Sequence, residues 1–249
     1  MKLFRGIDSY DLQEHSVVTV GSFDGVHCGH LSLLHSLQER AKARDARSVV
    51  VSFSPHPRVT LGRAEGLKLL TSDNEKATLL NSVGIDALLL LEFNSQLSQL
   101  SYEEFVVEYL IKRVNMVELI VGFNHQLGHN GGSYNNLAQI EQRHNFRTVL
   151  AKEYSCGKQH VSSTIIRDLI EQGNLIHANE LLSHNYPIFG WVNKAGIVQI
   201  REPLKLIPPV GEYRAIINGK DKKVIIDTSQ RVWCDLKETD VEIRLLTKV

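Results

Sequence analysis

Two histidines, His27 and His30, lie three residues apart in a segment that also holds several glycines. Imidazole N–H groups donate hydrogen bonds to phosphate oxygens, and side chains with this spacing face the same side of one helical turn. Gly29 lies between the two histidines and leaves room for a bulky group to approach the backbone. These residue types predict a site that holds a phosphate group.

The residues around the histidines predict the elements that position them. The apolar run 16–20 is expected to form a buried strand, and the leucine-rich run 30–37 an amphipathic helix. A strand that passes through glycines into a helix directs unpaired N–H groups and the positive end of the helix dipole at an anion. Asp24 is expected to stabilise the turn through hydrogen bonds to its own backbone. The glycine spacing matches neither the Walker loop nor the dinucleotide-binding fingerprint.

A second polar cluster begins at residue 162. Ser162, Ser163 and Thr164 are expected to begin a helix as N-cap residues. Arg167 follows within about one turn, where the positive end of the helix dipole disfavours a cation. An anion bound at this helix end resolves the conflict, since a guanidinium can hold phosphate oxygens through two hydrogen bonds.

These two segments resemble the two signatures of the nucleotidyltransferase superfamily. The segment from Gly21 to His30 contains the His-x-Gly-His pattern, and its Phe23-Asp24-Gly25 portion is similar to the form found in bacterial FAD synthetases. The stretch 162–167 resembles the second signature, which holds the triphosphate. The resemblance implies catalytic roles for His27, His30 and Arg167. It also implies that nucleotide or phosphate contacts come from a further set of residues: Gly21, Phe23, Asp24, Gly25, Gly29, Ser162, Ser163 and Thr164.

Two loops that follow predicted strands extend the resemblance to the flavin. The stretch Pro55-His56-Pro57 is expected to be a rigid loop that does not begin a helix cleanly. It resembles a stretch near the flavin site of FAD synthetases. Asn124 and Gly128 match the pattern of a second family loop, in which Leu127 replaces a phenylalanine. The resemblance thus implies flavin contacts from Pro55, His56, Pro57 and Asn124.

Alternating periodicities predict an α/β fold. Apolar strands are expected at 16–20, 47–53, 86–93, 117–123 and 147–152, with helices between them. Capping boxes at 72–75 and 101–104 mark two helix starts. This order favours a Rossmann-like parallel sheet with right-handed connections.

The chain changes character near Tyr186. Short alternating segments separated by turn residues predict a small antiparallel β-barrel. We therefore expect a nucleotidyltransferase domain over 1–185 and a barrel over 186–249. The barrel sequence resembles the opening strands of the riboflavin kinase module of FAD synthetases, but the Gly-Arg…Gly-Phe-Pro-Thr-x-Asn segment, the catalytic glutamate region and the terminal helix of that module are missing. No kinase activity is expected.

Composition limits the remaining classes. The chain has 249 residues, of which 43% are hydrophobic and 22% charged, and its formal net charge is zero. This balance does not favour nucleic-acid binding, and no run approaches membrane-spanning length. Three widely spaced cysteines, Cys28, Cys156 and Cys234, predict no disulfide framework and no metal site, with Cys28 only filling space on its helix. Cytoplasm is the expected location, and the sequence indicates no oligomeric state.

The expected reaction is adenylyl transfer from ATP to FMN, which yields FAD and pyrophosphate. Mg2+ would bridge the ATP phosphates, bound largely by substrate and water. One alternative is a nucleotidyltransferase with a different phosphate acceptor. Another is a catalytically weak flavin or nucleotide sensor, although such a protein has no need of both phosphate motifs.

Overall fold

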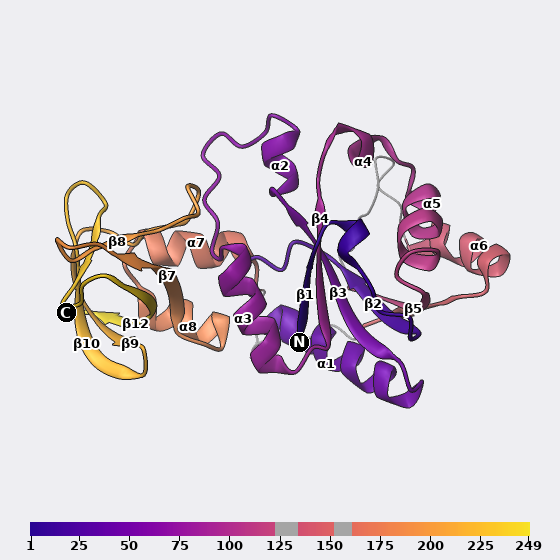
Figure 1. The fold of residues 1–249 in the computed structure, drawn as a ribbon, viewed down its shortest axis with the longest axis horizontal. Helices are drawn as coiled ribbons and strands as arrows, with labels where there is room; N and C mark the ends of the chain where they lie inside the picture. Colours follow the sequence, from indigo (N-terminus) through magenta and orange to yellow (C-terminus); the bar gives the residue numbers. More distant parts are fainter. Residues whose placement is uncertain (123–133, 152–160) are drawn as a thin grey trace. The chain divides into compact units, whose positions relative to one another are not determined.

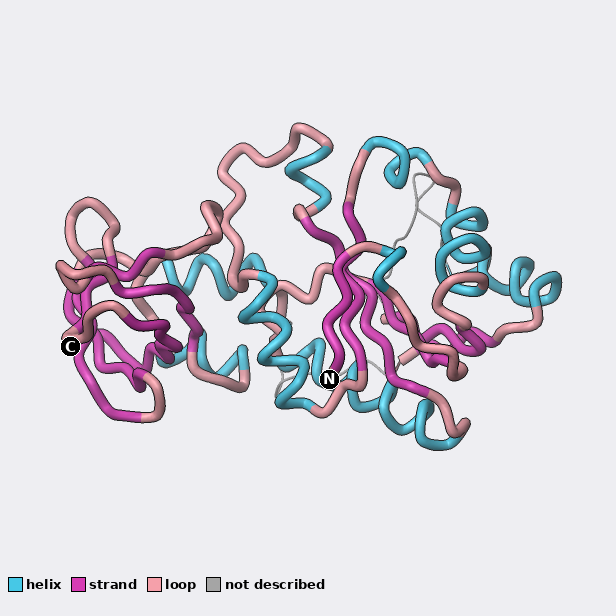
Figure 2. The backbone as a smooth tube through the Cα atoms, in the orientation of Figure 1, coloured by secondary structure: helices cyan, strands magenta, loops and turns pink. Residues whose placement is uncertain are grey.

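The computed structural model describes residues 1–122, 134–151 and 161–249. The chain divides into two compact units, each of which is described by itself. The sheet unit comprises Met1–Phe23, His30–Gly66 and Leu79–Tyr154. The barrel unit comprises Asp24–Gly29, Leu67–Thr78 and Ser155–Val249. Figure 1 traces the elements in chain order, and Figure 2 marks helix, strand and loop.

A six-stranded parallel sheet forms the centre of the sheet unit, in the order β1-β4-β3-β2-β5-β6. The four inner strands are buried along nearly their whole length, whereas β1 and β6 at the edges are largely exposed. Continuous burial explains why the inner strands contain runs of consecutive apolar residues rather than an alternating pattern. The strands are β1 (Lys2–Arg5), β2 (Ser16–Val20), β3 (Arg47–Ser54), β4 (Ala87–Glu92), β5 (Met116–Val121) and β6 (Arg147–Leu150).

Helices connect these strands in the way that a parallel sheet requires. Both predicted capping boxes are present: Ser72 with Glu75 at α3, and Ser101 with Glu104 at α5. The connecting helices are η1 (Ile7–Ser9), α1 (Cys28–Ala43), α2 (Pro57–Thr60), α3 (Asp73–Val83), α4 (Ser95–Gln99), α5 (Tyr102–Glu104), η2 (Phe105–Ile111) and α6 (Tyr134–His144).

The strand order has a topological switch point between β2 and β5. From β2 the chain moves outward through β3 to β4, and then returns to place β5 on the other side of β2. Open α/β sheets bind ligands outside the carboxyl ends of the strands at such a point. Gly21 and Gly122, the first residues after β2 and β5, therefore lie where this fold places ligands.

Six antiparallel strands close into a barrel in the second unit, in the order β10-β11-β8-β7-β12-β9. Helices α7 (Ser163–Glu171) and α8 (Leu175–Leu182) belong to the same compact unit. The strands are β7 (Tyr186–Val192), β8 (Ile197–Gln199), β9 (Gly211–Ile217), β10 (Lys220–Ile226), β11 (Val232–Cys234) and β12 (Thr239–Lys248). The α/β fold with a parallel sheet and a small antiparallel barrel is confirmed.

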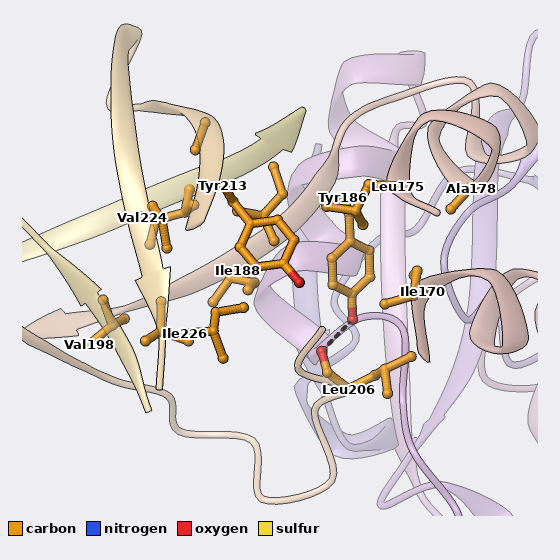
Figure 3. Packing of buried hydrophobic residues seen from close by; sticks show 14 of the residues in the cluster. Ile170, Leu175, Ala178, Tyr186, Ile188, Val198, Leu206, Tyr213, Val224 and Ile226 are labelled. Carbon is orange, nitrogen blue, oxygen red and sulfur yellow. Dashed lines mark hydrogen bonds between the residues drawn. The ribbon is translucent and has the colours of Figure 1, made fainter. Parts of the chain in front are cut away.

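One hydrophobic core joins these two helices to the barrel. It contains Ile170 and Leu175 from the helices and Tyr213 and Val224 from the strands (Figure 3). The hydroxyl of buried Tyr186 donates a 2.7 Å hydrogen bond to the Leu206 carbonyl oxygen, which satisfies its one donor (Figure 3). The helix pair and the barrel therefore share one buried interior.

The state of the cysteines differs from the expectation that came from their spacing. Cys28 is disulfide-bonded, whereas Cys234 is free. The prediction that Cys28 only fills space was wrong, because a disulfide depends on which sulfur atoms the tertiary fold brings together.

Among the residues that the structure describes, none of the helices has both the length and the apolar character needed to span a membrane.

A buried carboxylate connects helix α1 to the sheet. Glu118 of β5 is fully buried and accepts hydrogen bonds from Arg40 and Arg44, whose side chains remain 40% and 29% exposed. Burial raises the pKa of Glu118, but the hydrogen bonds from both guanidiniums outweigh that effect and leave the pKa below its ordinary value. The two arginines thereby hold the C-terminal half of α1 against β5.

Removing the two arginines should lower the free energy of unfolding more than removing the charge of Glu118. The double variant Arg40→Ala/Arg44→Ala leaves a charged Glu118 buried and should lower the free energy of unfolding by about 3–5 kcal/mol. Glu118→Gln leaves two arginines that water can reach and should cost about 1–3 kcal/mol. Urea unfolding measures both, with Arg47→Ala in the exposed Glu14–Arg47 pair as a control expected to cost less than about 1 kcal/mol. Equal costs for the first two variants would contradict this assignment.

Candidate active site

Asp24 of the first motif is hydrogen-bonded to residues far along the chain. Its carboxylate is almost fully buried and accepts hydrogen bonds from the backbone N–H groups of Leu70 and Thr71 at 3.2 and 3.0 Å. The Thr71 hydroxyl also donates to it at 3.3 Å and accepts from the Gly25 N–H at 3.0 Å. The predicted bonds within its own turn are therefore replaced by bonds to a segment 46 residues further along the chain. The reason is that a buried carboxylate needs several donors, and that segment supplies them.

Arg167 of α7 contacts the same carboxylate. Its Nη2 atom donates to Asp24 Oδ2 at 2.7 Å, and its Nε atom donates to the Lys68 carbonyl oxygen at 2.6 Å. The anion expected beside this cation from the sequence was a bound phosphate, and that remains a prediction; in the structure Arg167 also pairs with the carboxylate of Asp24. Within the barrel unit, the two motifs are thus brought together at a charged pair.

The serines at the start of α7 have separate functions. Ser162 is the N-cap residue, and its side chain accepts a hydrogen bond from the Ile165 N–H at 3.4 Å. The Ser163 hydroxyl donates to the Asp24 carbonyl oxygen at 2.9 Å, which adds a second connection between the motifs. Thr164 is exposed in the first turn of the helix. Ser162 confirms the predicted cap, and Ser163 shows a tertiary contact that capping rules do not predict.

His27 lies immediately before the first residue of α1 and is 7% exposed. Burial lowers the pKa of His27 to about 4, against an opposing effect of the Asp24 charge. His184 and Arg167 contribute smaller effects that also lower this pKa. His27 is therefore a neutral imidazole at pH 7, which carries one N–H that can donate to a phosphate oxygen.

Two glycines of the motif make room for specific neighbours. A Cβ atom on Gly29 would lie 3.2 Å from the His27 ring, so the bulky group that approaches this glycine is the neighbouring imidazole. Gly25 has a φ of +86°, and a Cβ atom there would lie 2.7 Å from Leu70 Cδ1. The Gly25 carbonyl oxygen lies 2.8 Å from His184 Nε2. A Cβ atom at either position would crowd a neighbouring side chain, so glycine suits the close packing of this turn.

The part of the motif that belongs to the sheet unit is aromatic. Phe23 is buried with a φ of +47°, and its ring centroid lies 5.1 Å from that of His30. A Cβ atom on Gly21 would lie 3.1 Å from the Phe23 ring. Non-glycine residues with positive φ cost free energy and cluster at functional sites. Packing of Phe23 therefore restricts the His30 ring in this unit.

The proline-rich stretch after β3 differs from its prediction in one respect. Pro57 begins α2, with His56 as the N-cap residue whose Nδ1 accepts from the Arg58 N–H at 3.2 Å. The expectation that this stretch does not begin a helix was wrong, because proline suits the first helical position, where no N–H partner is needed. The Ser54–Pro55 peptide bond is cis.

An aromatic cluster that sequence reasoning missed lies beside this stretch. The Phe53 ring is 5.4 Å from that of Phe93 and 6.2 Å from that of Phe105. The Thr60 hydroxyl donates to the Phe93 carbonyl oxygen at 2.6 Å, which connects α2 to the end of β4. Aromatic faces are suited to packing against a planar ring system. The signal was present as aromatic residues at the carboxyl ends of two neighbouring strands.

Part of the predicted flavin loop lies in a segment that the structure does not describe. Asn124, Leu127 and Gly128 lie outside the described residues. Within 1–122, 134–151 and 161–249, no three His, Cys, Asp or Glu side chains are grouped as ligands of a metal ion would be. The sequence also missed Lys68, Thr71 and His184, since nothing in their local pattern shows that they contact the motif.

The lowered pKa of His27 predicts a pH dependence of stability. An unfolded His27 binds a proton below about pH 6.5, whereas the folded one does so only below about 4. Stability from this group is therefore complete above pH 6.5 and is lost as the pH falls toward 4, by about 3 kcal/mol at most. Urea unfolding of wild type and His27→Asn between pH 7.5 and 4 should show the steeper loss in wild type. The same substitution at exposed His35 is the matched control, and parallel pH profiles for wild type and His27→Asn would refute the shift.

Comparison with known proteins connects this geometry to a family. A family model described as FAD synthetase matches residues 9–165, which is more than half of the chain. The chain is 33% identical over 202 residues to the bifunctional riboflavin kinase/FMN adenylyltransferase of Buchnera aphidicola. It is 32% identical over 195 residues to the protein of the same description from Escherichia coli. These matches cover 79% and 77% of this chain but only 65% and 62% of the relatives.

A shorter relative and one solved structure complete the comparison. The chain is 29% identical over 215 residues to a FAD synthetase of Listeria monocytogenes, which covers 84% of this chain and 86% of that one. A crystal structure described as a macrolide-efflux protein from Streptococcus pneumoniae has a TM-score of 0.85 at 21% identity. It matches 100% of this chain and 91% of its own, and at this identity it shows the fold alone. The match of the family model over residues 9–165, which include the strands β2 to β6 and the first motif, shows that this chain belongs to the FAD synthetase family.

Proposed function

We propose that the protein is an FMN adenylyltransferase, which converts ATP and FMN to FAD and pyrophosphate. The observation that carries the proposal is the pairing of the two superfamily motifs at Asp24 and Arg167, 2.7 Å apart. Family membership supports the choice of substrates. A phosphate oxygen of FMN attacks the α-phosphorus of ATP, the bond from that phosphorus to the bridging oxygen breaks, and pyrophosphate leaves.

The residues of the two motifs bind and orient the reacting phosphates in this proposal. Arg167 uses two of its five N–H groups on Asp24 and Lys68 among the described residues, which leaves donors for the β- and γ-phosphates. Asp24 orients this guanidinium, and the α7 N-terminus adds backbone N–H groups and the serine and threonine hydroxyls of 162–164. His27 and His30 donate hydrogen bonds to oxygens on which negative charge builds, since positioning and charge stabilisation carry most of the rate in phosphoryl chemistry.

The proposal also covers Mg2+, the flavin contacts and the division of the chain into domains. Mg2+ arrives with ATP and is held by phosphate oxygens and water. Pro55, His56 and Pro57 contact the flavin, as does Asn124, with Gly21, Phe23, Gly25 and Gly29 shaping the nucleotide side. The transferase occupies 1–185 and the barrel 186–249, where β7 begins. We propose no oligomeric state. Because ATP is a substrate, we propose a cytoplasmic location.

The activity is tested by incubating the purified protein with ATP, Mg2+ and either FMN or riboflavin, and then separating the flavins by chromatography. FAD should form from FMN, whereas riboflavin should remain unchanged because the barrel lacks the kinase segments of the family. FMN formed from riboflavin would overturn the proposed lack of kinase activity. An absence of FAD at any FMN concentration would overturn the proposed function.

The proposed role of His30 predicts a large catalytic defect without unfolding. His30→Ala removes one donor to the transition state and should lower the turnover number by about 100- to 1000-fold. Circular dichroism should remain that of wild type, because the side chain is only partly buried. His35→Ala on the same helix should retain full turnover. FAD formation by His30→Ala at the wild-type rate would show that His30 has no catalytic role.

A further inference from the structure

A second charged pair, fully buried, lies within the barrel unit. Lys205 Nζ is 2.8 Å from Glu75 Oε2, and each side chain is 1% exposed. Lys205 precedes β9, and Glu75 lies in the first turn of α3. Burial lowers the pKa of Lys205, and the Glu75 charge opposes that effect. Such a pair contributes little net stability, so its presence calls for another explanation.

Each partner makes further contacts that join the barrel to residues 69–75. Lys205 Nζ donates to the Leu70 carbonyl oxygen at 2.5 Å and lies 4.2 Å from the centre of the Tyr186 ring. Glu75 accepts from the Ser72 N–H at 2.7 Å and from the Phe189 N–H of β7 at 2.8 Å. All of these donors and acceptors are satisfied at once, which is the condition under which a buried polar network gives one defined geometry.

The backbone around residue 205 pairs with the same segment. The Leu69 N–H donates to the Leu204 carbonyl oxygen at 2.7 Å, and the Leu206 N–H donates to the Leu69 carbonyl oxygen at 2.9 Å. This is an isolated parallel bridge between Leu69 and Lys205. Residues 204–206 therefore act as a short strand that holds residue 69 in place.

One peptide unit connects Lys205 to the proposed phosphate site. The peptide between Leu70 and Thr71 accepts from Lys205 through its carbonyl oxygen and donates to Asp24 Oδ1 through its N–H at 3.0 Å. A cation at the oxygen polarises this peptide and strengthens its N–H as a donor. Rotation of the peptide plane would break both contacts together. The position of the Asp24 carboxylate thus depends on Lys205.

Arg167 depends on the same segment from its other side. Its Nε atom donates to the Lys68 carbonyl oxygen, and its Nη2 atom donates to the Asp24 carboxylate. Residues 68–71 therefore bind both members of the Asp24–Arg167 pair through backbone groups. A shift of this segment would displace the guanidinium as well as the carboxylate.

We propose that Lys205, held by Glu75, is a positioning residue for the Asp24–Arg167 pair, and hence that the barrel is a working part of the adenylyl-transfer site. The inference rests on the proposed function, and it assigns the barrel a role that does not depend on kinase chemistry. In this role Lys205 does not contact a substrate. It orients the peptide that orients Asp24, and Asp24 orients the arginine that binds the ATP phosphates.

The test uses the full chain with Glu75→Gln/Lys205→Met. This double variant removes both charges, and glutamine keeps one acceptor oxygen for the two backbone N–H groups, of Ser72 and Phe189, that Glu75 serves. The KM for ATP should rise and kcat/KM for ATP should fall by about 10- to 100-fold, as expected for a misplaced binding group. The KM for FMN should stay within about twofold, since the altered residues act on the ATP phosphates. Deuterium exchange of the peptide 67–75 should become faster, because its bonds to Lys205 and Asp24 weaken.

Ile226→Ala in the barrel core is the matched control for lost stability. Ile226 is buried in β10 and makes no polar contact with residues 68–71, so its truncation should lower Tm while leaving the KM for ATP as in wild type. Glu75→Gln/Lys205→Gln serves as a second variant if the first double variant does not fold, since it leaves no buried charge and the amide at 205 still donates a hydrogen bond.

The outcomes separate this inference from the proposed function. An unchanged KM for ATP together with unchanged exchange of 67–75 in the folded variant overturns the positioning role. Equal rises in KM for ATP and for FMN also overturn it, since a general loss of structure would act on both substrates. Failure of the wild-type protein to make FAD overturns the proposed function. In that case deuterium exchange, and ATP binding measured by calorimetry, still decide whether Lys205 positions Asp24 and Arg167.

Discussion

Burial of the Asp24 carboxylate is the constraint on which the candidate site depends. A carboxylate removed from water must find hydrogen-bond donors, and here they come from Leu70, Thr71 and Arg167. These donors belong to the segment before α3 and to α7. Satisfying one side chain therefore brings together three stretches that are far apart along the chain, and this convergence gives the two phosphate motifs a common centre.

The same constraint changes how the barrel is understood. The barrel unit is a closed sheet with helices α7 and α8 on a shared hydrophobic core, and it also includes the turn 24–29 and the segment 67–78. The first motif after β2 thus contributes residues to a compact unit that contains the barrel. In a family whose longer members are described as bifunctional, this chain spans less than two thirds of the first two relatives. The role proposed for Lys205 gives the barrel a structural function that does not require a second activity.

The buried ion pairs of the two units differ in how far their cations are exposed to solvent. In the sheet unit, Glu118 is buried while its arginine partners reach solvent, so the pair mainly anchors helix α1 to β5. In the barrel unit, Glu75 and Lys205 are both excluded from water, and Lys205 donates to the Leu70 carbonyl oxygen of the peptide unit whose N–H donates to Asp24. A fully buried pair restricts geometry more than it adds stability. This difference is the physical basis for treating the first pair as architectural and the second as part of the site.

Local pattern alone indicated the inner strands of the sheet, the barrel strands and several helix starts, although it missed helix α2. The apolar runs gave the inner strands of the sheet, alternation after Tyr186 gave the barrel strands, and serine–glutamate spacing gave the starts of α3 and α5. The identity of the two motifs also came from sequence, because phosphate binding requires particular residue types at a strand–helix junction and at a helix N-terminus. These features depend on interactions within a few residues, which a single sequence displays directly.

Only the tertiary structure decided the partners. Asp24 bonds to residues 46, 47 and 143 positions away, Glu75 serves both as a helix cap and as the partner of Lys205, and Cys28 is disulfide-bonded. Which buried polar groups meet is settled by how the elements pack, since each desolvated donor and acceptor must be paired at the same time. No local periodicity carries that information, so the contacts that build the site were the part that sequence could not supply.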